Sequence, residues 1–256
     1  MKKLLALVLA LAMCVTAMAA FAETDSEYVK AKGTLVVGIT DFEPMDYRDA
    51  DGNWIGFDAD LAALFAESLG VTVVFQEIEW DNKVLELNGQ MIDCVWNGMT
   101  LTDEVMAAMG CSEAYMVNAQ VIVMNAEKLA AYPDTVEMSE LAGLSFAVES
   151  GSAGAACAGE LGFTAVEVTS QAAALMEVAA GTSDAAIIDL LMAQAMTGEG
   201  TGYAQLDYGF ALNSEEYGIG FRTGSDLVDL ANAFLEEKAA DGTVNELLVK
   251  YGLIAE

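Results

Sequence analysis

The feature that most constrains the fold is an alternation of short β-rich runs with runs of helical periodicity. The first set begins at Thr34 and predicts three strands and two helices: "TLVVGI" (34–39), "DADLAALFAESLG" (58–70), "VTVVFQEI" (71–78), a helix near 81–89, and "IDCVW" (92–96). Asp58 is the predicted N-cap of the first helix and Gly70 its stop. Strand–helix–strand order predicts right-handed crossovers and a parallel sheet.

The same rhythm restarts after Asn118, so the chain holds a second α/β unit. Strands are predicted at 121–124, 144–149, 185–189 and 217–221, and helices from 153, at 171–181, near 226–240 and near 243–251. Neither a Pro-rich nor a Gly/Ser-rich linker separates the two sets. The pattern therefore predicts an α/β fold of two lobes joined by strand-like crossings.

The first 22 residues have the features of a signal peptide. Lys2 and Lys3 precede an apolar run, and Ala20-Phe21-Ala22 has the small-x-small pattern of a cleavage site. We expect cleavage after Ala22 and export to a periplasmic or extracellular location. Cys14 raises the alternative of a lipoprotein, which is less favoured because the bulky Met13 precedes it.

Charge and composition exclude several classes of function. The chain has a net charge of −30 and no basic patch, which excludes binding to nucleic acid. It contains no histidine, which removes Ser-His and Cys-His nucleophiles and histidine-based metal sites. Cys94, Cys111 and Cys157 lack metal-ligand spacing and are interpreted as small buried residues, at least one of them unpaired. We expect neither a metal nor a cofactor.

Open α/β sheets bind ligands beyond the carboxyl ends of their strands. Three predicted loops lie at such ends, at 40–47, 96–102 and 149–153, and Asp189 ends the strand at 185–189. Two sheets that face each other would place these groups on the two sides of one cleft.

Seven short motifs, in order and with matching spacing, resemble the amino-acid class of solute-binding proteins of ABC importers. They are "GFDADLA" (56–62), "EIEWD" (77–81), "NGMTLT" (97–102), "VESGSAG" (148–154), "DAAIID" (184–189), "EEYGIGFRTGSDL" (215–227) and "ADGTVNELLVKYG" (240–252). The resemblance implies a type II periplasmic-binding-protein fold with a discontinuous first lobe and a hinge of two crossing segments. It divides the chain into a signal peptide (1–22), lobe 1 (23–118 and 216–256) and lobe 2 (119–215).

The same resemblance implies a ligand site of six residues. Asp189 matches the partner of the ligand's ammonium group, and Gly98 and Thr100 match the segment that contacts both ends of an amino acid. Ser152 matches the residue whose amide meets the ligand's carboxylate. Phe42 matches an aromatic side chain of the first loop, and Trp80 matches a second wall of the cleft.

Four of these six residues also have a structural alternative. Asp189 could only cap the helix that follows it, and Thr100 or Thr102 could cap the helix at 103–109, where we assign the cap to Thr102. Phe42 and Trp80 could belong to the core, although the polar loop around Phe42 favours an exposed ring. Val105 stands where the family has the arginine that binds the ligand's carboxylate, and we expect it to pack inward with Met109. No nearby side chain replaces the arginine, although the free amides of the helix that begins after Ser152 could do so in part.

The expected function is delivery of an amino acid or related small polar ammonium compound to an ABC permease by a monomeric binding protein that performs no chemistry. Two alternatives remain open. One is an enzyme on the same fold, similar to cyclohexadienyl dehydratase, for which Glu43, Asp46 or Glu149 could supply an acid or base. The other is a ligand sensor without a transport role.

Overall fold

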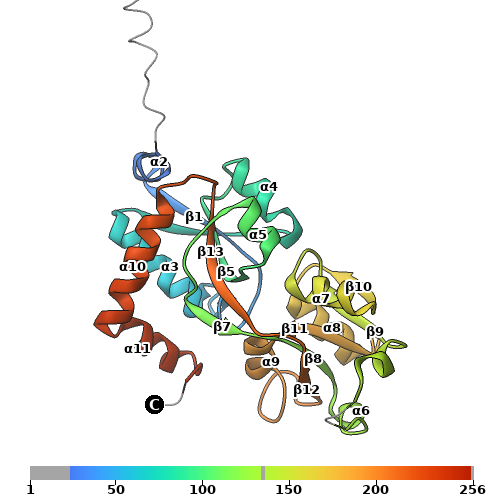
Figure 1. The fold of residues 1–256 in the computed structure, drawn as a ribbon. Helices are drawn as coiled ribbons and strands as arrows, with labels where there is room; N and C mark the ends of the chain where they lie inside the picture. Colours follow the sequence, from blue (N-terminus) through green and yellow to red (C-terminus); the bar gives the residue numbers. More distant parts are fainter. Residues whose placement is uncertain (1–23, 134–135, 255–256) are drawn as a thin grey trace, which may run out of the picture.

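The computed structural model describes residues 24–133 and 136–254, and the expected signal peptide lies outside them. Figure 1 shows two β-sheets side by side, each flanked by helices, with the chain crossing between them more than once. None of the helices in the described ranges is long and apolar enough to cross a membrane.

The sheet of lobe 1 has the strand order β4-β1-β5-β13-β6, and β7 pairs with β13. Its strands are β1 (Thr34–Ile39), β4 (Thr72–Glu77), β5 (Cys94–Thr100), β6 (Gly110–Cys111), β7 (Met116–Asn118) and β13 (Glu215–Phe221). β1 is parallel to β4 and β5, whereas β13 is antiparallel to β5, β6 and β7. We call the part of the chain that packs around this sheet lobe 1.

The sheet of lobe 2 has the order β10-β9-β11-β8-β12. Its strands are β8 (Gln120–Asn125), β9 (Ser145–Glu149), β10 (Thr164–Val168), β11 (Ala185–Asp189) and β12 (Leu206–Ala211). β9 is parallel to β10 and β11, and β8 is antiparallel to β11 and β12. The part of the chain around this sheet is lobe 2.

The expectation of purely parallel sheets is wrong for β8 and β13. The chain enters lobe 2 through β7 and β8 and returns to lobe 1 through β12 and β13. A strand that enters a lobe from the other lobe starts at the edge between them, where Tyr217 of β13 pairs with Thr100 at the end of β5. It must therefore run opposite to the strands that end at this edge.

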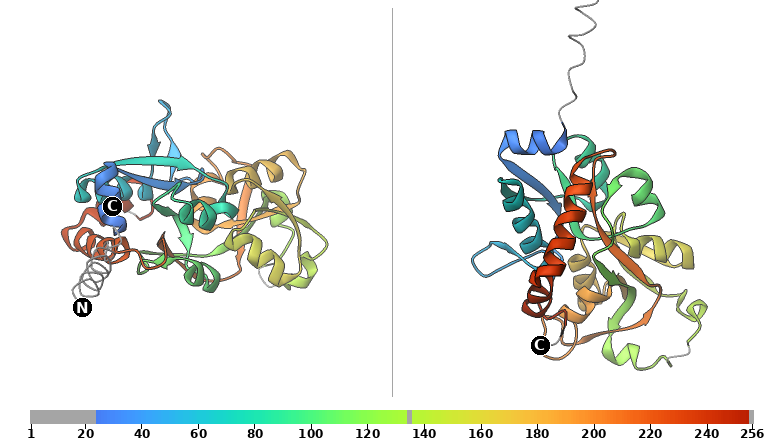
Figure 2. Two further views of the ribbon diagram at one scale, coloured as in Figure 1. Left: turned by 90° about the horizontal axis from the view of Figure 1, so that it is seen from above. Right: turned by 60° about the vertical axis from the view of Figure 1, so that its left-hand side comes forward.

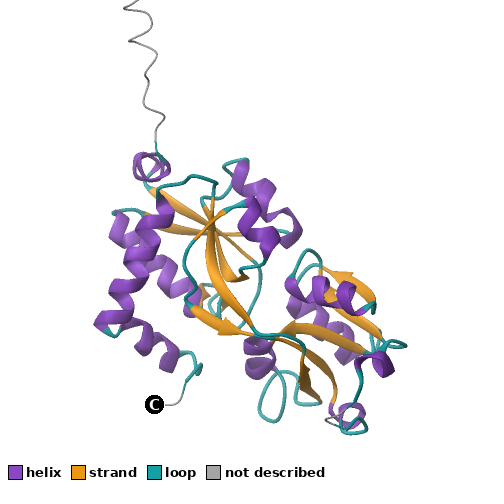
Figure 3. Cartoon of the chain, viewed as in Figure 1, coloured by secondary structure: helices purple, strands orange, loops and turns teal. Residues whose placement is uncertain are grey.

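Helices cover both faces of each sheet (Figure 3). In lobe 1, α3 and α10 pack on one face, where the rings of Phe65 and Phe234 lie 5.3 Å apart, and α4 and α5 pack on the other. In lobe 2, α8 packs on one face and α7 on the other. These helices are α3 (Phe57–Leu69), α4 (Lys83–Asn88), α5 (Asp103–Ala108), α7 (Ala153–Leu161), α8 (Gln171–Ala180) and α10 (Leu227–Asp241).

The remaining elements are short or lie at the periphery, as the views in Figure 2 show. They are α2 (Asp25–Lys32), α6 (Ala126–Leu129), α9 (Leu190–Met196), α11 (Thr243–Lys250), the hairpin β2 (Tyr47–Arg48) and β3 (Trp54–Ile55), and the 3-10 helices η1 (Trp80–Asn82) and η2 (Met138–Leu141). We propose lobe boundaries after residues 118 and 215. The pairing of β7 with β13 in lobe 1 and of β8 with β12 in lobe 2 supports this division.

Asp58 does not cap α3 as expected. Gly56 occupies the N-cap position, and Asp58 is a fully buried residue of the first turn. Its Oδ2 accepts hydrogen bonds from the Gly98 amide at 2.6 Å and the Tyr115 hydroxyl at 2.8 Å. Asp58 therefore holds the backbone at Gly98, in the segment that is predicted to contact the ligand.

A second carboxyl group, that of Asp46, is buried in the same region. Its Oδ2 accepts a hydrogen bond from Asn97 Nδ2 at 2.7 Å, and its Oδ1 has no partner among the described residues. Burial, and next the charge of Asp58, raise the pKa of Asp46 well above its usual value, and burial raises the pKa of Asp58 to about 7. The folded protein thus holds protons here that an unfolded chain would release.

Because of Asp46 and Asp58, we expect the free energy of unfolding to fall as the pH rises. A carboxyl group whose pKa is higher in the folded state lowers the free energy of unfolding as the pH rises from its unfolded pKa near 4 to its folded pKa, which is about 7 for Asp58. We expect Asp46→Asn to reduce the slope and to raise the free energy of unfolding at pH 8 by about 1–3 kcal/mol. Urea denaturation at pH 5 and pH 8 measures both.

Asp103→Asn is the control, because it removes a carboxylate from an exposed position. If the wild type and Asp46→Asn lose equal stability between the two pH values, the titration of Asp46 does not contribute.

Candidate functional site

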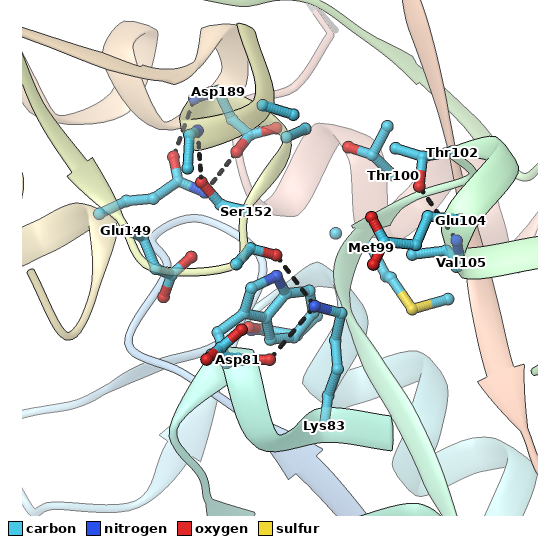
Figure 4. A pocket seen from close by; sticks show the side chains of 18 of the residues that line it. Asp81, Lys83, Met99, Thr100, Thr102, Glu104, Val105, Glu149, Ser152 and Asp189 are labelled. Carbon is cyan, nitrogen blue, oxygen red and sulfur yellow. Dashed lines mark hydrogen bonds between the residues drawn. The ribbon is translucent and has the colours of Figure 1, made fainter. Parts of the chain in front are cut away.

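A cleft of about 590 Å³ lies between the lobes, a size typical of small-molecule sites. The strand ends β5, β9 and β11 reach it, together with the N-termini of α4, α5 and α7 (Figure 4). All six residues of the predicted site line this cleft: Phe42, Trp80, Gly98, Thr100, Ser152 and Asp189. Their contact with a ligand stays a prediction, but the structure brings them together in one cleft between two sheets, as expected from the order of the strands.

Asp189 ends β11 at the inner end of the cleft and is 4% exposed. It occupies the N-cap position of α9, but its side chain makes no capping hydrogen bond. Its Oδ1 instead accepts from the Tyr217 hydroxyl at 2.6 Å, and Gln171 donates to its Oδ2. The structural alternative, a cap alone, therefore does not account for this carboxylate.

Asp189 lies beside a second carboxylate, that of Glu215. Asn118 and Gln120 each donate from one side-chain amide group to both Asp189 Oδ1 and Glu215 Oε1. The Thr100 hydroxyl also donates to Glu215 Oε1, at 2.9 Å. Burial, and next the charge of Glu215, raise the pKa of Asp189 to about 7. A cation in the cleft would favour the ionised form of Asp189.

The segment that begins with Gly98 follows the expected local chemistry. Gly98 has φ +53°, and a Cβ there would lie 2.5 Å from Cε1 of Phe42, so the position requires glycine. Thr102 caps α5, because its hydroxyl accepts from the Val105 amide at 3.1 Å. This confirms the assignment of the cap to Thr102 and leaves Thr100 on the cleft.

Of the two aromatic residues, Phe42 differs from the expectation and Trp80 fits both of its interpretations. Phe42 is 1% exposed and packs edge-on against Tyr217 with ring centroids 6.4 Å apart. The expectation of an exposed ring is wrong, because the turn from Phe42 to Asp46 folds the ring into the core of lobe 1. Trp80 is 7% exposed and joins the apolar cluster behind α4 and α5 while lining the cleft.

Ser152 begins α7 on the lobe 2 side of the cleft. Its hydroxyl accepts from the Ala155 amide at 3.1 Å, so it is the N-cap. Its own amide donates to the Glu149 carbonyl at 3.2 Å and is therefore engaged within the turn. The contact of this amide with a ligand carboxylate stays a prediction, and it would require that turn bond to be shared or broken.

Lys83 is the site residue that sequence reasoning missed. Val105 packs with Met109 as expected, and Lys83, a basic residue not named from the sequence, lines the same cleft. Lys83 Nζ donates to the Trp80 carbonyl at 3.2 Å and to the Gly151 carbonyl at 3.0 Å, and lies 4.9 Å from the Trp80 ring centroid. Its position three residues after Trp80, at the start of a predicted helix, was the available signal.

The lobes touch at the mouth of the cleft. Gly151 has φ +70°, and a Cβ there would lie 2.7 Å from Oδ1 and 2.8 Å from Cα of Asp81. Lys83 of lobe 1 donates to the Gly151 carbonyl of lobe 2 at this point. The structure is therefore a form in which the two lobes meet across the cleft.

The acids and thiols named from the sequence lie in different environments. Of the three carboxyl groups considered for an enzyme, Glu149 lines the cleft, Asp46 is buried beneath it, and Glu43 lines a different pocket. Cys94 is buried as expected, but Cys111 and Cys157 are only half-buried, and all three are free thiols. Burial raises the pKa of Cys157 to about 11, which keeps it protonated and poorly nucleophilic.

Comparison with known proteins matches this architecture. The arginine-binding extracellular protein ArtP of Bacillus subtilis is 28% identical over 259 residues, covering 96% of each chain, and the L-arginine-binding protein of Pseudomonas aeruginosa is 29% identical, covering 98% of this chain and 96% of its own. The crystal structure of a mutant of ArgBP from T. maritima has a TM-score of 0.81 at 29% identity, covering 90% of this chain and all of that one.

A cyclohexadienyl dehydratase of Pseudomonas aeruginosa is 31% identical, but over 83 residues that cover 32% of this chain and 31% of its own. The family model for bacterial extracellular solute-binding proteins, family 3, matches residues 35–254. The fold is the type II periplasmic-binding-protein fold, and the chain belongs to the bacterial extracellular solute-binding proteins of family 3.

Proposed function

We propose that this protein binds a small solute with an ammonium group, an amino acid or a related amine, and delivers it to an ABC transporter outside the cytoplasm. The observation that carries the proposal is Asp189, a buried carboxylate that lines the cleft between the lobes and has no cation beside it among its hydrogen-bond partners in the described chain. Relatives named for binding arginine, cystine, or lysine, arginine and ornithine support the ligand class. We further propose that the exported form is a monomer whose signal peptide is cleaved after Ala22.

The charge of the cleft favours a ligand with positive charge. Among the described residues, one basic side chain, that of Lys83, lines the cleft against six acidic ones: Asp81, Asp103, Glu104, Glu149, Glu160 and Asp189. For an α-amino acid, we propose that the ammonium group binds Asp189 and that the carboxylate binds Lys83. An ammonium group has three N–H donors, and two of those of Lys83 are engaged with carbonyl oxygens. The third donor is the one that we propose for the ligand's carboxylate.

We propose that the protein binds without chemistry. The likeness to a dehydratase covers about a third of the chain, whereas the likeness to named binding proteins covers nearly all of it. A thermal-shift screen of the mature protein against amino acids, diamines and cyclic carboxylate precursors of aromatic amino acids tests the proposal, because a ligand that binds only the folded state raises the melting temperature. Recovery of the ligand unchanged after incubation separates binding from turnover.

Asp189→Asn tests the ammonium partner. The change removes the charge, and a hydrogen bond to a charged group contributes about 1.5–3 kcal/mol, so we expect about a 10- to 100-fold loss of affinity. We expect stability to change by about 1 kcal/mol at most, because the lost bond from Gln171 is offset by relief of the repulsion from Glu215. Calorimetry with the best ligand of the screen measures the first, and urea denaturation the second.

The matched control is Asp103→Asn, which removes one carboxylate from the exposed rim of the same cleft. Equal losses of affinity in the two variants would show that the cleft acts only through its general negative charge and that Asp189 has no specific role.

Lys83→Met tests the carboxylate partner. The variant keeps the length of the side chain but removes the charge and the bond to Gly151, so we expect weaker binding of every ligand through weaker closure. For an amino acid the loss should be about tenfold greater than for its decarboxylated amine, the scale of one charge-assisted hydrogen bond. Calorimetry with lysine and 1,5-diaminopentane makes this comparison, and identical losses for the two would contradict a contact between Lys83 and the carboxylate.

A further inference from the structure

Glu149 is a buried carboxyl group for which the binding mode proposed above has no use. It is the last residue of β9, is 2% exposed, and lines the cleft. Within the described ranges, 24–133 and 136–254, its Oε1 has no hydrogen-bond partner. In Figure 4 the carboxyl group lies on the lobe 2 wall, between Asp189 and the Lys83 side of the pocket. Buried polar atoms without a partner are rare and costly, so this one requires an explanation.

The charged groups around Glu149 do not satisfy it. Asp189 on β11 and Glu79, just before η1, repel its negative form, whereas a hydrogen bond from the neutral Thr40 side chain and the charge of Lys83 on α4 favour it. Lys83, however, is bound to the carbonyls of Trp80 and Gly151, and no described atom pair of Lys83 and Glu149 forms an ion pair within 4.0 Å. The carboxyl group therefore faces a cleft with two like charges near it and one cation engaged elsewhere.

We propose that Glu149 binds a second cationic nitrogen group of the ligand, so that the solute carries one positive group at Asp189 and another at Glu149. This inference rests on the proposed function, which supplies the first of the two contacts. A charged donor fits better than a neutral one, because two buried carboxylates near each other require compensating charge as well as hydrogen bonds. Basic amino acids and aliphatic diamines share this chemistry.

Proton exchange gives the proposal a second readout. Burial, and next the charge of Asp189, raise the pKa of Glu149 to about 8, so the group is largely protonated at pH 7. A cation binds the ionised form, so binding releases this proton, and affinity rises with pH up to about pH 8. Asp189, with a pKa of about 7, adds to the release at pH 7 and below.

The experiment compares ligands that differ only in the second cation. Lysine is paired with norleucine, and 1,5-diaminopentane with 1-aminopentane, in calorimetry with the mature wild type, Glu149→Gln and Glu160→Gln. Glu160 lies on the exposed rim of the cleft and is the control for loss of one carboxylate. We expect Glu149→Gln to weaken the dicationic ligands by about 10- to 100-fold and their monocationic partners by less than about threefold.

Two further results are expected if Glu149 is the partner. Proton release on binding of lysine at pH 8, measured in buffers of different ionisation enthalpy, should fall in Glu149→Gln and stay unchanged in Glu160→Gln. The tighter of the two dicationic ligands shows whether the protein prefers basic amino acids or diamines, because lysine retains a carboxylate and 1,5-diaminopentane lacks one.

The outcomes separate this inference from the proposed function. If norleucine or 1-aminopentane binds and Glu149→Gln weakens both members of each pair equally, or neither, Glu149 is not the partner of a second cation while the proposed function stands. If none of the four ligands binds the folded wild type but the thermal-shift screen finds another amino acid or amine that does, the inference fails and the proposed function stands. If the screen also finds no ligand, both fail.

Discussion

The hydrogen bonds from Asn118 and Gln120 to Asp189 and Glu215 are the interaction on which the rest of the site depends. They lie where the strands that pass between the lobes meet the end of β11. Neutral amide groups hold two carboxylates close together without cancelling their charge. The segments that join the lobes therefore also hold two carboxylates whose negative charge a bound cation would compensate.

The few basic residues do not neutralise these two carboxylates, because most of them lie away from the cleft. Arg222 donates to Asp25 at 3.0 Å, and Lys32 donates to Asp93 at 2.6 Å, so both stabilise lobe 1 away from the cleft. Arg48 stacks on Trp54 in the β2–β3 hairpin. Lys83 alone among the basic residues lines the cleft in the described chain, and it binds carbonyl oxygens. The excess of acidic over basic residues in the chain is therefore also present among the residues that line the cleft.

Much of this arrangement is readable from the sequence because it depends on local pattern. The strand at 185–189, the helix at 171–181 with its glycine stop, and the cap at Thr102 all follow from short-range periodicity and side-chain chemistry. The reversed direction of β8 and β13 depends on pairing between distant segments, which periodicity does not encode. The burial of Phe42, the role of Asp58 and the position of Lys83 depend likewise on contacts across 40 or more residues, such as the bond from Gly98 to Asp58.

The contact between Gly151 and Asp81 has a consequence for how the cleft recognises charge. Because glycine places no side chain between the lobes, the backbone of lobe 2 lies against Asp81 of lobe 1 at this point of the cleft. Two unit charges 4 Å apart attract by about 1 kcal/mol in water and by about 4 kcal/mol at an effective dielectric constant of 20. The strength with which the cleft distinguishes ligands of different charge therefore depends on how closely the two lobes approach each other around the ligand. Gly151 contributes to this distinction only by the absence of a side chain, which permits the close approach to Asp81.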